Sequence, residues 1–212
     1  MSLKSKIISL VAGVVFTTGA ASAQDGFYVG AGLSYGHMST ALSTTNFVKS
    51  NDDYGSVTVI GGYRKQVENR FWALEAQLEV PISPELESFG VPCSVAATGP
   101  YGCDIDGVLR LRGVHGGDIG NGLELYGTAG FVLVSGDGAT SPTTTDSVMT
   151  GGFSFGVGLQ KAITPTLKLR GEINHDLAKI GISEASGALN PPGCCDVNFT
   201  QTSLQISLVK SF

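Results

Sequence analysis

The last thirteen residues of the chain, 200–212, read TQTSLQISLVKSF and decide the fold. Leu204, Ile206, Leu208 and Phe212 share one parity, and serine and glutamine fill most of the other. A period of two predicts a β-strand with one apolar face. In a soluble protein a C-terminal strand of this kind would be an exposed edge and an aggregation hazard. We therefore expect it to pair with the first strand and close a barrel, which leaves no edge.

The N-terminus has the features of a secretory signal. Two lysines precede an apolar stretch at 7–16 (IISLVAGVVF), and an A-x-A cleavage site ends at Ala23. The sequence predicts a cleaved signal peptide at 1–23 and a single domain at 24–212. Without those lysines, 13 − 2 = 11 basic residues face 18 acidic ones, a net charge of −7. Such a charge argues against nucleic acid as a partner, and no later run is apolar enough for a transmembrane helix.

Alternating segments of about ten residues, each followed by a connection, continue along the chain. We expect eight strands, each with one apolar parity. They are residues 27–35, 54–64, 70–80, 105–115, 122–134, 148–161, 166–178 and 200–212.

The connections alternate between long and short. The long ones are 37–53, 81–104, 135–147 and 179–199, and the short ones are 65–69, 116–121 and 162–165. Short turns at one end and long loops at the other are typical of an outer-membrane barrel, with the short turns in the periplasm. Phe27, Tyr63, Trp72 and Phe212 lie at strand ends beside the short turns, where we expect a periplasmic aromatic girdle.

The chain resembles the eight-stranded outer-membrane barrels of the OmpA transmembrane-domain and opacity-protein (porin-family) superfamily. The likeness rests on the signal ending at Ala23, the opening strand Gly26-Phe27-Tyr28-Val29-Gly30-Ala31-Gly32, and the terminal Leu204-x-Ile206-x-Leu208-x-x-x-Phe212. It implies an all-β, antiparallel, up-and-down transmembrane barrel in the outer membrane of a Gram-negative bacterium. It also implies that the barrel assembly machinery reads the terminal strand, with Phe212 as the key residue. The lipid of the outer membrane would be the other partner.

The inward parity gathers charges of both signs. They are Glu75, Glu79, Arg110, Arg112, Glu124, Lys168, Arg170 and Glu172. An eight-stranded barrel is only wide enough for side chains to fill, and charges held there must be paired. Adjacent strands suggest that Glu75 meets Arg110 and that Arg112 meets Glu124. The network would either plug the lumen or act as the gate of a narrow pore for ions or small solutes.

All four cysteines lie in predicted long connections, Cys93 and Cys103 in the second, and Cys194 and Cys195 in the fourth. In an oxidising compartment this predicts loop disulfides. Four cysteines allow three pairings, and the strain of a vicinal bridge favours those that tie the two loops together. A metal site is the alternative, although the spacing differs from that of a zinc ribbon.

The sequence offers little support for an enzyme. The resemblance brings in the outer-membrane lipid A deacylases, which use a histidine and a serine two residues further on. Here the residue two after His175 is Leu177. We therefore expect no catalytic residues, no cofactor and no metal. The predicted role is structural or at the cell surface, either envelope integrity or adhesion and ligand contact through the loops. A narrow channel is the second hypothesis, and a lipid-modifying enzyme the third.

Overall fold

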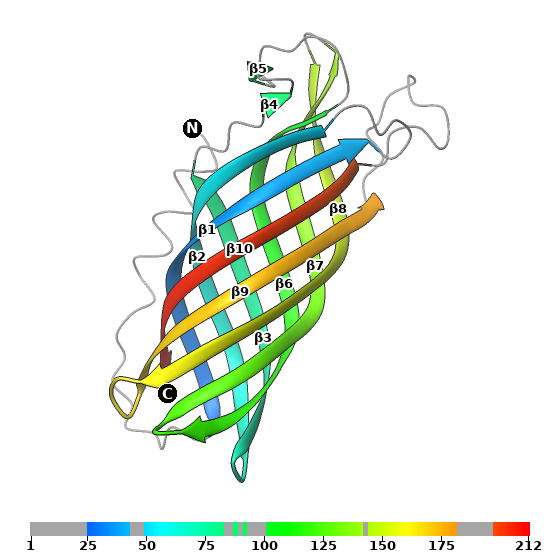
Figure 1. The fold of residues 1–212 in the computed structure, drawn as a ribbon. Coiled ribbons are helices and arrows are strands. Elements are labelled where there is room, and N and C mark those ends of the chain that lie inside the picture. Colours follow the sequence, from blue (N-terminus) through cyan, green and yellow to red (C-terminus); the bar gives the residue numbers. More distant parts are fainter. Residues whose placement is uncertain are drawn as a thin grey trace.

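The computed structural model describes residues 25–42, 49–82, 87–88, 91–92, 101–141, 144–181 and 197–212, so the predicted signal peptide lies outside it. Eight long antiparallel strands and two short ones form a single sheet (Figure 1). They are β1 (Gly26–Leu42), β2 (Lys49–Val67), β3 (Arg70–Ile82), β4 (Glu87–Ser88), β5 (Val91–Pro92), β6 (Tyr101–Gly120), β7 (Leu123–Ser141), β8 (Thr144–Ala162), β9 (Leu167–Gly181) and β10 (Val197–Ser211). Within these residues, no helix has the length and apolar character needed to cross a membrane.

The sheet closes on itself through the first and last long strands. β1 pairs with β2 on one side and with β10 on the other, so that Leu33 lies opposite both Val57 and Ile206. The N–H of Phe212 donates to the carbonyl of Phe27 at 3.0 Å, which extends this seam to the final residue. The closed eight-stranded barrel that the terminal strand predicts is confirmed.

Short turns join the long strands at one end of the barrel, where the C-terminus also lies (Figure 1). Asn121 and Gly122 connect β6 to β7, and both have positive φ angles, 58° and 68°. Two such residues form the tight hairpin turn whose twist matches that of the flanking strands. Glu68 and Asn69 join β2 to β3, and residues 163–166 join β8 to β9.

Several strands extend beyond the predicted limits at the other end. The predicted long loop at 135–147 is wrong, because β7 and β8 continue through it as a paired hairpin with Ser141 opposite Thr144. The expectation that no cysteine lies in a strand is also wrong for Cys103, whose backbone belongs to β6. Backbone hydrogen bonds between strands can continue beyond the apolar band, where outward side chains no longer need to be apolar. The alternation of apolar and polar residues therefore ends before the strand pairing does.

Inward and outward positions alternate along each long strand, as the period of two predicts. Large apolar side chains face outward and are exposed, for example Leu33 (65%), Leu74 (72%) and Ile206 (59%). The interior is layered along the barrel axis, with charged side chains in the middle. At the long-connection end they are followed by an apolar cluster that includes Met38, Val132 and other buried residues.

Candidate functional site: the barrel interior

Four charged side chains form a closed ring of ion pairs in the middle of the barrel. Arg112 on β6 contacts Glu75 on β3 at 2.7 Å and Glu172 on β9 at 2.5 Å. Arg170 on β9 contacts the same two carboxylates at 2.5 and 2.8 Å. None of the four side chains is more than 3% exposed. Each guanidinium thus bridges two carboxylates, which is the full pairing that buried charges require.

Two tyrosines complete this ring. Tyr28 donates its hydroxyl hydrogen to Glu75 at 2.8 Å, and Tyr126 donates to Glu172 at 2.6 Å. The Nε of Arg170 in turn donates to the Tyr126 hydroxyl at 2.6 Å, and its guanidinium lies 4.5 Å from the centre of that ring. Each tyrosine hydroxyl donates to a carboxylate lone pair that no arginine uses. The ionic network therefore also fixes the positions of the two uncharged tyrosine side chains.

Inward glycines give the tyrosines their space. A Cβ at Gly158 would collide with the Tyr126 hydroxyl, and one at Gly62 would lie 2.5 Å from the Tyr28 ring. Both glycines pair in register with the tyrosine that they accommodate. A larger residue at either position would push the tyrosine side chain away from the carboxylate to which it donates.

A second ionic group lies toward the long-connection end. Arg110, whose side chain is fully buried, contacts Glu79 at 2.6 Å and Asp176 at 2.5 Å. Glu79 also accepts hydrogen bonds from Ser56 at 2.7 Å and Tyr54 at 2.9 Å. Among the described side chains, Arg110 is the only cation in ion-pair contact with either carboxylate.

A third ionic group lies at the short-turn mouth. Arg64 holds Glu124 through two hydrogen bonds, at 2.7 and 2.9 Å, and Lys168 contacts the same carboxylate at 2.8 Å. Gln160 adds a further donor at 2.6 Å. The guanidinium of Arg64 lies 3.8 Å from the centre of the Phe71 ring. This group is partly exposed, with 16% of the Glu124 side chain accessible.

The structure places all eight predicted interior charges inside the barrel, but it pairs them differently from the prediction. Glu75 does not pair with Arg110, and Arg112 does not pair with Glu124; both predicted contacts are wrong. Adjacent strands place side chains side by side on one wall, whereas a guanidinium reaches across the lumen. Between the neighbouring strands β3 and β6, the register places Glu75 opposite Arg112, not opposite Arg110. Other partners come from strands that are not neighbours, such as β6 and β9 for Arg110 and Asp176.

Asp176 belongs to the network, although it is absent from the predicted set of interior charges. It shares the inward parity of Arg170 and Glu172 on the same strand, so extending that parity by two more positions would have found it. The Gln77–Gln205 hydrogen bond across the lumen, at 2.7 Å, was also missed. A glutamine on the polar face of a strand looks the same in the sequence whether that face lines a lumen or contacts water.

The predicted girdle and terminal-strand residues lie on the outer surface. Phe27 and Tyr63 are in edge-to-face contact, with ring centroids 5.1 Å apart. Trp72 stacks on His115 at 3.9 Å. Leu204, Ile206 and Leu208 are exposed along β10. The ring of Phe212 lies 5.5 Å from the Nζ of Lys210.

Two further histidines lie on the outer wall. His37 contacts Asp53 at 2.8 Å, and the Nδ1 of His175 lies 2.8 Å from the hydroxyl of Thr202 on the neighbouring strand. On the strand of His175 itself, the residue two positions further on is Leu177, so the neighbouring hydroxyl comes from another strand. In the described part of the chain, no cluster of three or more His, Cys, Asp or Glu side chains is arranged to hold a metal ion.

The predicted disulfides concern residues outside this description. Cys93, Cys194 and Cys195 lie outside the described residues, and only the backbone of Cys103 is described. The pairing of the four cysteines stays a prediction.

Comparison with known proteins agrees with this architecture. A family described as the outer membrane protein beta-barrel domain matches residues 7–212. The chain belongs to this family. A search of curated proteins found no match.

Two proteins of known structure are similar to this chain. Neisserial surface protein A (NspA) is 14% identical, with a TM-score of 0.51, and the match covers 92% of this chain and 100% of NspA. Ail, the attachment invasion locus protein of Yersinia pestis, is 13% identical with a TM-score of 0.47, covering 88% of this chain and 99% of Ail. At 14% identity the likeness to NspA shows the fold alone.

Proposed function

We propose that this outer-membrane barrel protein spans the outer membrane of a Gram-negative bacterium as a closed, non-conducting barrel. Its role is structural or at the surface, either in envelope integrity or in adhesion and ligand contact through the long connections. The observation that carries the proposal is the ionic filling of the interior. The ion pairs there join five cations to five anions. These are Arg64, Arg110, Arg112, Lys168 and Arg170, and Glu75, Glu79, Glu124, Glu172 and Asp176.

The outer surface supports insertion in a membrane. From Phe27 to Tyr35 along β1, outward side chains are apolar or aromatic, and at ~3.3 Å per residue and a tilt of roughly 40° this band is roughly 20 Å tall. Aromatic rings lie at its short-turn edge, as in membrane-spanning barrels. Such a surface is stable in lipid, whereas in water it would be an aggregation hazard.

The opposite edge of the band is polar. A row of outward residues crosses four neighbouring strands there. On the neighbouring strands β2, β1, β10 and β9, in this order, the row is Asp53, His37, Thr202 and His175. These groups need water or lipid headgroups as neighbours, so the row supports a headgroup boundary toward the long connections, with the short turns in the periplasm.

The interior supports a closed lumen. A conducting pathway would have to pass the fully buried side chains of Arg110 and Arg112 and then the apolar cluster around Met38 and Val132. Every charge in the middle layers already has partners of opposite sign, so a passing ion would have to displace one of them. We therefore propose that the network fills the barrel and stabilises it, with no gating role and no enzymatic one.

Planar-bilayer recording tests this function. The refolded wild-type barrel should give no stable conductance steps, with different migration of boiled and unboiled samples on SDS gels as the control for folding. Stable steps from the wild type, whose size changes in Arg110→Ala, would establish a channel and reject the closed lumen.

A further inference from the structure

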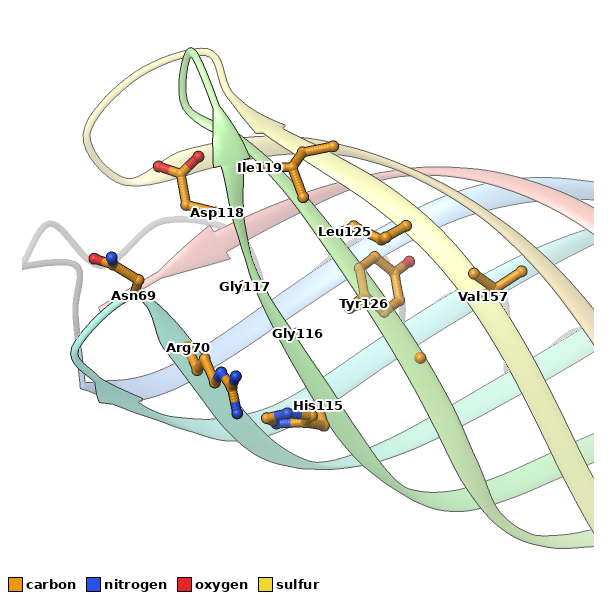
Figure 2. Close-up of a pocket in the computed structure, with 11 residues that line it drawn as sticks. Asn69, Arg70, His115, Gly116, Gly117, Asp118, Ile119, Leu125, Tyr126 and Val157 are labelled. Carbon is orange, nitrogen blue, oxygen red and sulfur yellow. The ribbon is translucent and has the colours of Figure 1, made fainter.

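A hollow lies on the outer wall of the barrel beside the short turns. Two rows of outward residues cross β3, β6, β7 and β8 there, and a glycine interrupts each row. In strand order they are Trp72, His115, Gly127 and Val157, and Arg70, Gly117, Leu125 and Leu159. With no side chains at Gly117 and Gly127, a hollow of about 440 Å³ opens between the flanking residues (Figure 2).

The hollow has one apolar and one polar side. Ile119, Leu125 and Val157 line the apolar side, and all three are exposed. Arg70 and His115 lie together on the other side (Figure 2). Arg70 is exposed and makes no ion pair with any described residue. The carboxylate of Asp118 also lines the hollow, where it accepts a hydrogen bond from the N–H of Gly120 at 2.6 Å. The hollow therefore presents a guanidinium without an ion-pair partner among the described residues, next to an apolar wall.

His115 is held in a fixed orientation at the border between these two sides. Its ring stacks on Trp72 with centroids 3.9 Å apart. Its Nδ1 lies 3.1 Å from the carbonyl oxygen of Phe71 and so carries the hydrogen of that bond. This leaves Nε2 as the nitrogen available to a ligand, and the stacked pair forms a rigid wall for the hollow.

We propose that this hollow is a binding site for one glycerophospholipid of the leaflet at the short-turn end. An acyl chain lies over the two glycines against the apolar side, and the phosphate binds Arg70. Charge complementarity selects this ligand, because a guanidinium binds phosphate through two parallel hydrogen bonds. The outward cations Lys65 and Lys161 lie at the same end of the barrel and mark the same headgroup level. The inference rests on the proposed membrane insertion.

The position of the sole tryptophan provides the assay. Trp72 is the only tryptophan in the chain and contacts His115. The refolded full chain in an uncharged detergent is titrated with phosphatidylglycerol carrying brominated acyl chains, which quench tryptophan fluorescence on contact. A site predicts saturable quenching at low lipid fractions. Brominated diacylglycerol, which lacks the phosphate, should need about ten times more lipid for half-quenching, since a charge-assisted contact is lost.

Two variants separate the headgroup contact from the acyl-chain contact. Arg70→Ala should weaken phosphatidylglycerol about tenfold and leave diacylglycerol unchanged. Gly127→Leu should abolish saturable quenching by both lipids, because it fills the hollow. A Cβ at Gly127 has no atom closer than Gly156 O at 3.8 Å, so the barrel tolerates it. Gly61→Leu is the matched control, an outward glycine on β2 with no atom within 4 Å of its Cβ.

The outcomes distinguish this site from the proposed function. Quenching that rises linearly with lipid, or Gly127→Leu behaving like Gly61→Leu, would reject the binding site while the folded barrel kept its heat-modifiable migration. Loss of that migration in the wild type would instead reject the membrane barrel itself. Equal weakening of both lipids by Arg70→Ala would reject the phosphate contact.

Discussion

Replacing Arg110 with methionine should destabilise the barrel by more than any outward substitution. The side chain of Arg110 is fully buried and contacts Glu79 at 2.6 Å and Asp176 at 2.5 Å. When Arg110 is removed, neither of these buried carboxylates keeps an ion-pair contact with a cation of the described residues. Breaking a buried ion pair by removing one partner costs about 3–5 kcal/mol, and we expect a loss of this size in the free energy of unfolding.

Urea unfolding in detergent micelles or lipid vesicles measures this loss, with the fluorescence of the single tryptophan, Trp72, as the signal. The matched control is Lys161→Met, which removes an exposed outward cation from β8 and should change the free energy of unfolding by about 0.5 kcal/mol or less.

A triple variant, Arg110→Met with Glu79→Gln and Asp176→Asn, isolates the charge. The amides keep hydrogen-bonding capacity toward Tyr54 and Ser56, which now donate to Glu79, and no charge stays unpaired. We expect it to recover about 2 kcal/mol or more of the loss, because replacing a whole buried ion pair is often close to neutral. A loss below about 1 kcal/mol in the single variant, or a triple variant no more stable than the single one, would refute this reasoning.

Three further predictions concern the seam, the lumen glycines and the outer wall. Deleting Phe212, or changing it to serine, should reduce the heat-modifiable outer-membrane fraction far more than Ser183→Ala in the last long connection; normal assembly would contradict a special role for the terminal residue. Gly158→Leu should lower the free energy of unfolding by about 1–3 kcal/mol, because its side chain collides with a buried tyrosine hydroxyl. Gly171→Leu, with no atom within 4 Å of its Cβ on the outer wall, should be nearly neutral, and equal losses would contradict the packing argument. Expression of the wild type and of Thr202→Val should give the same lipid A acylation by mass spectrometry, since the strand N–H groups are used in the ladder and offer no oxyanion donors; an acyl chain lost only with the wild type would reveal an enzyme.

Much of the interior was predictable because parity is a local property. Once the strands are recognised, each side chain is assigned to the inside or the outside by counting in twos. This assignment places Glu75, Arg112 and Glu172 inside, as found. The same rule, carried from Glu172 to the second inward position after it on β9, would have added Asp176.

The hollow on the outer wall could not have been predicted in the same way. Gly117 and Gly127 are ordinary outward positions on two strands, and nothing local distinguishes them from Gly61 or Gly171. They form a hollow because the register of β6 and β7 places each glycine opposite a larger residue of the other strand, Leu125 and His115. Register is a property of the paired strands and cannot be read from either strand alone.

By itself, the sequence determined the strand pattern, the turn end and the sorting of side chains between lumen and outer wall, because all three follow from a two-residue period and from turn chemistry. Only the tertiary structure decided which charges pair. The register of β3 and β6 places Glu75 opposite Arg112, so Arg110 pairs with Glu79 instead. Arg110 also meets Asp176, because closure curves the sheet until its guanidinium on β6 reaches β9 across the lumen. Partners across a closed barrel depend on strand number and stagger, which are set when residues 200–212 pair with the first strand.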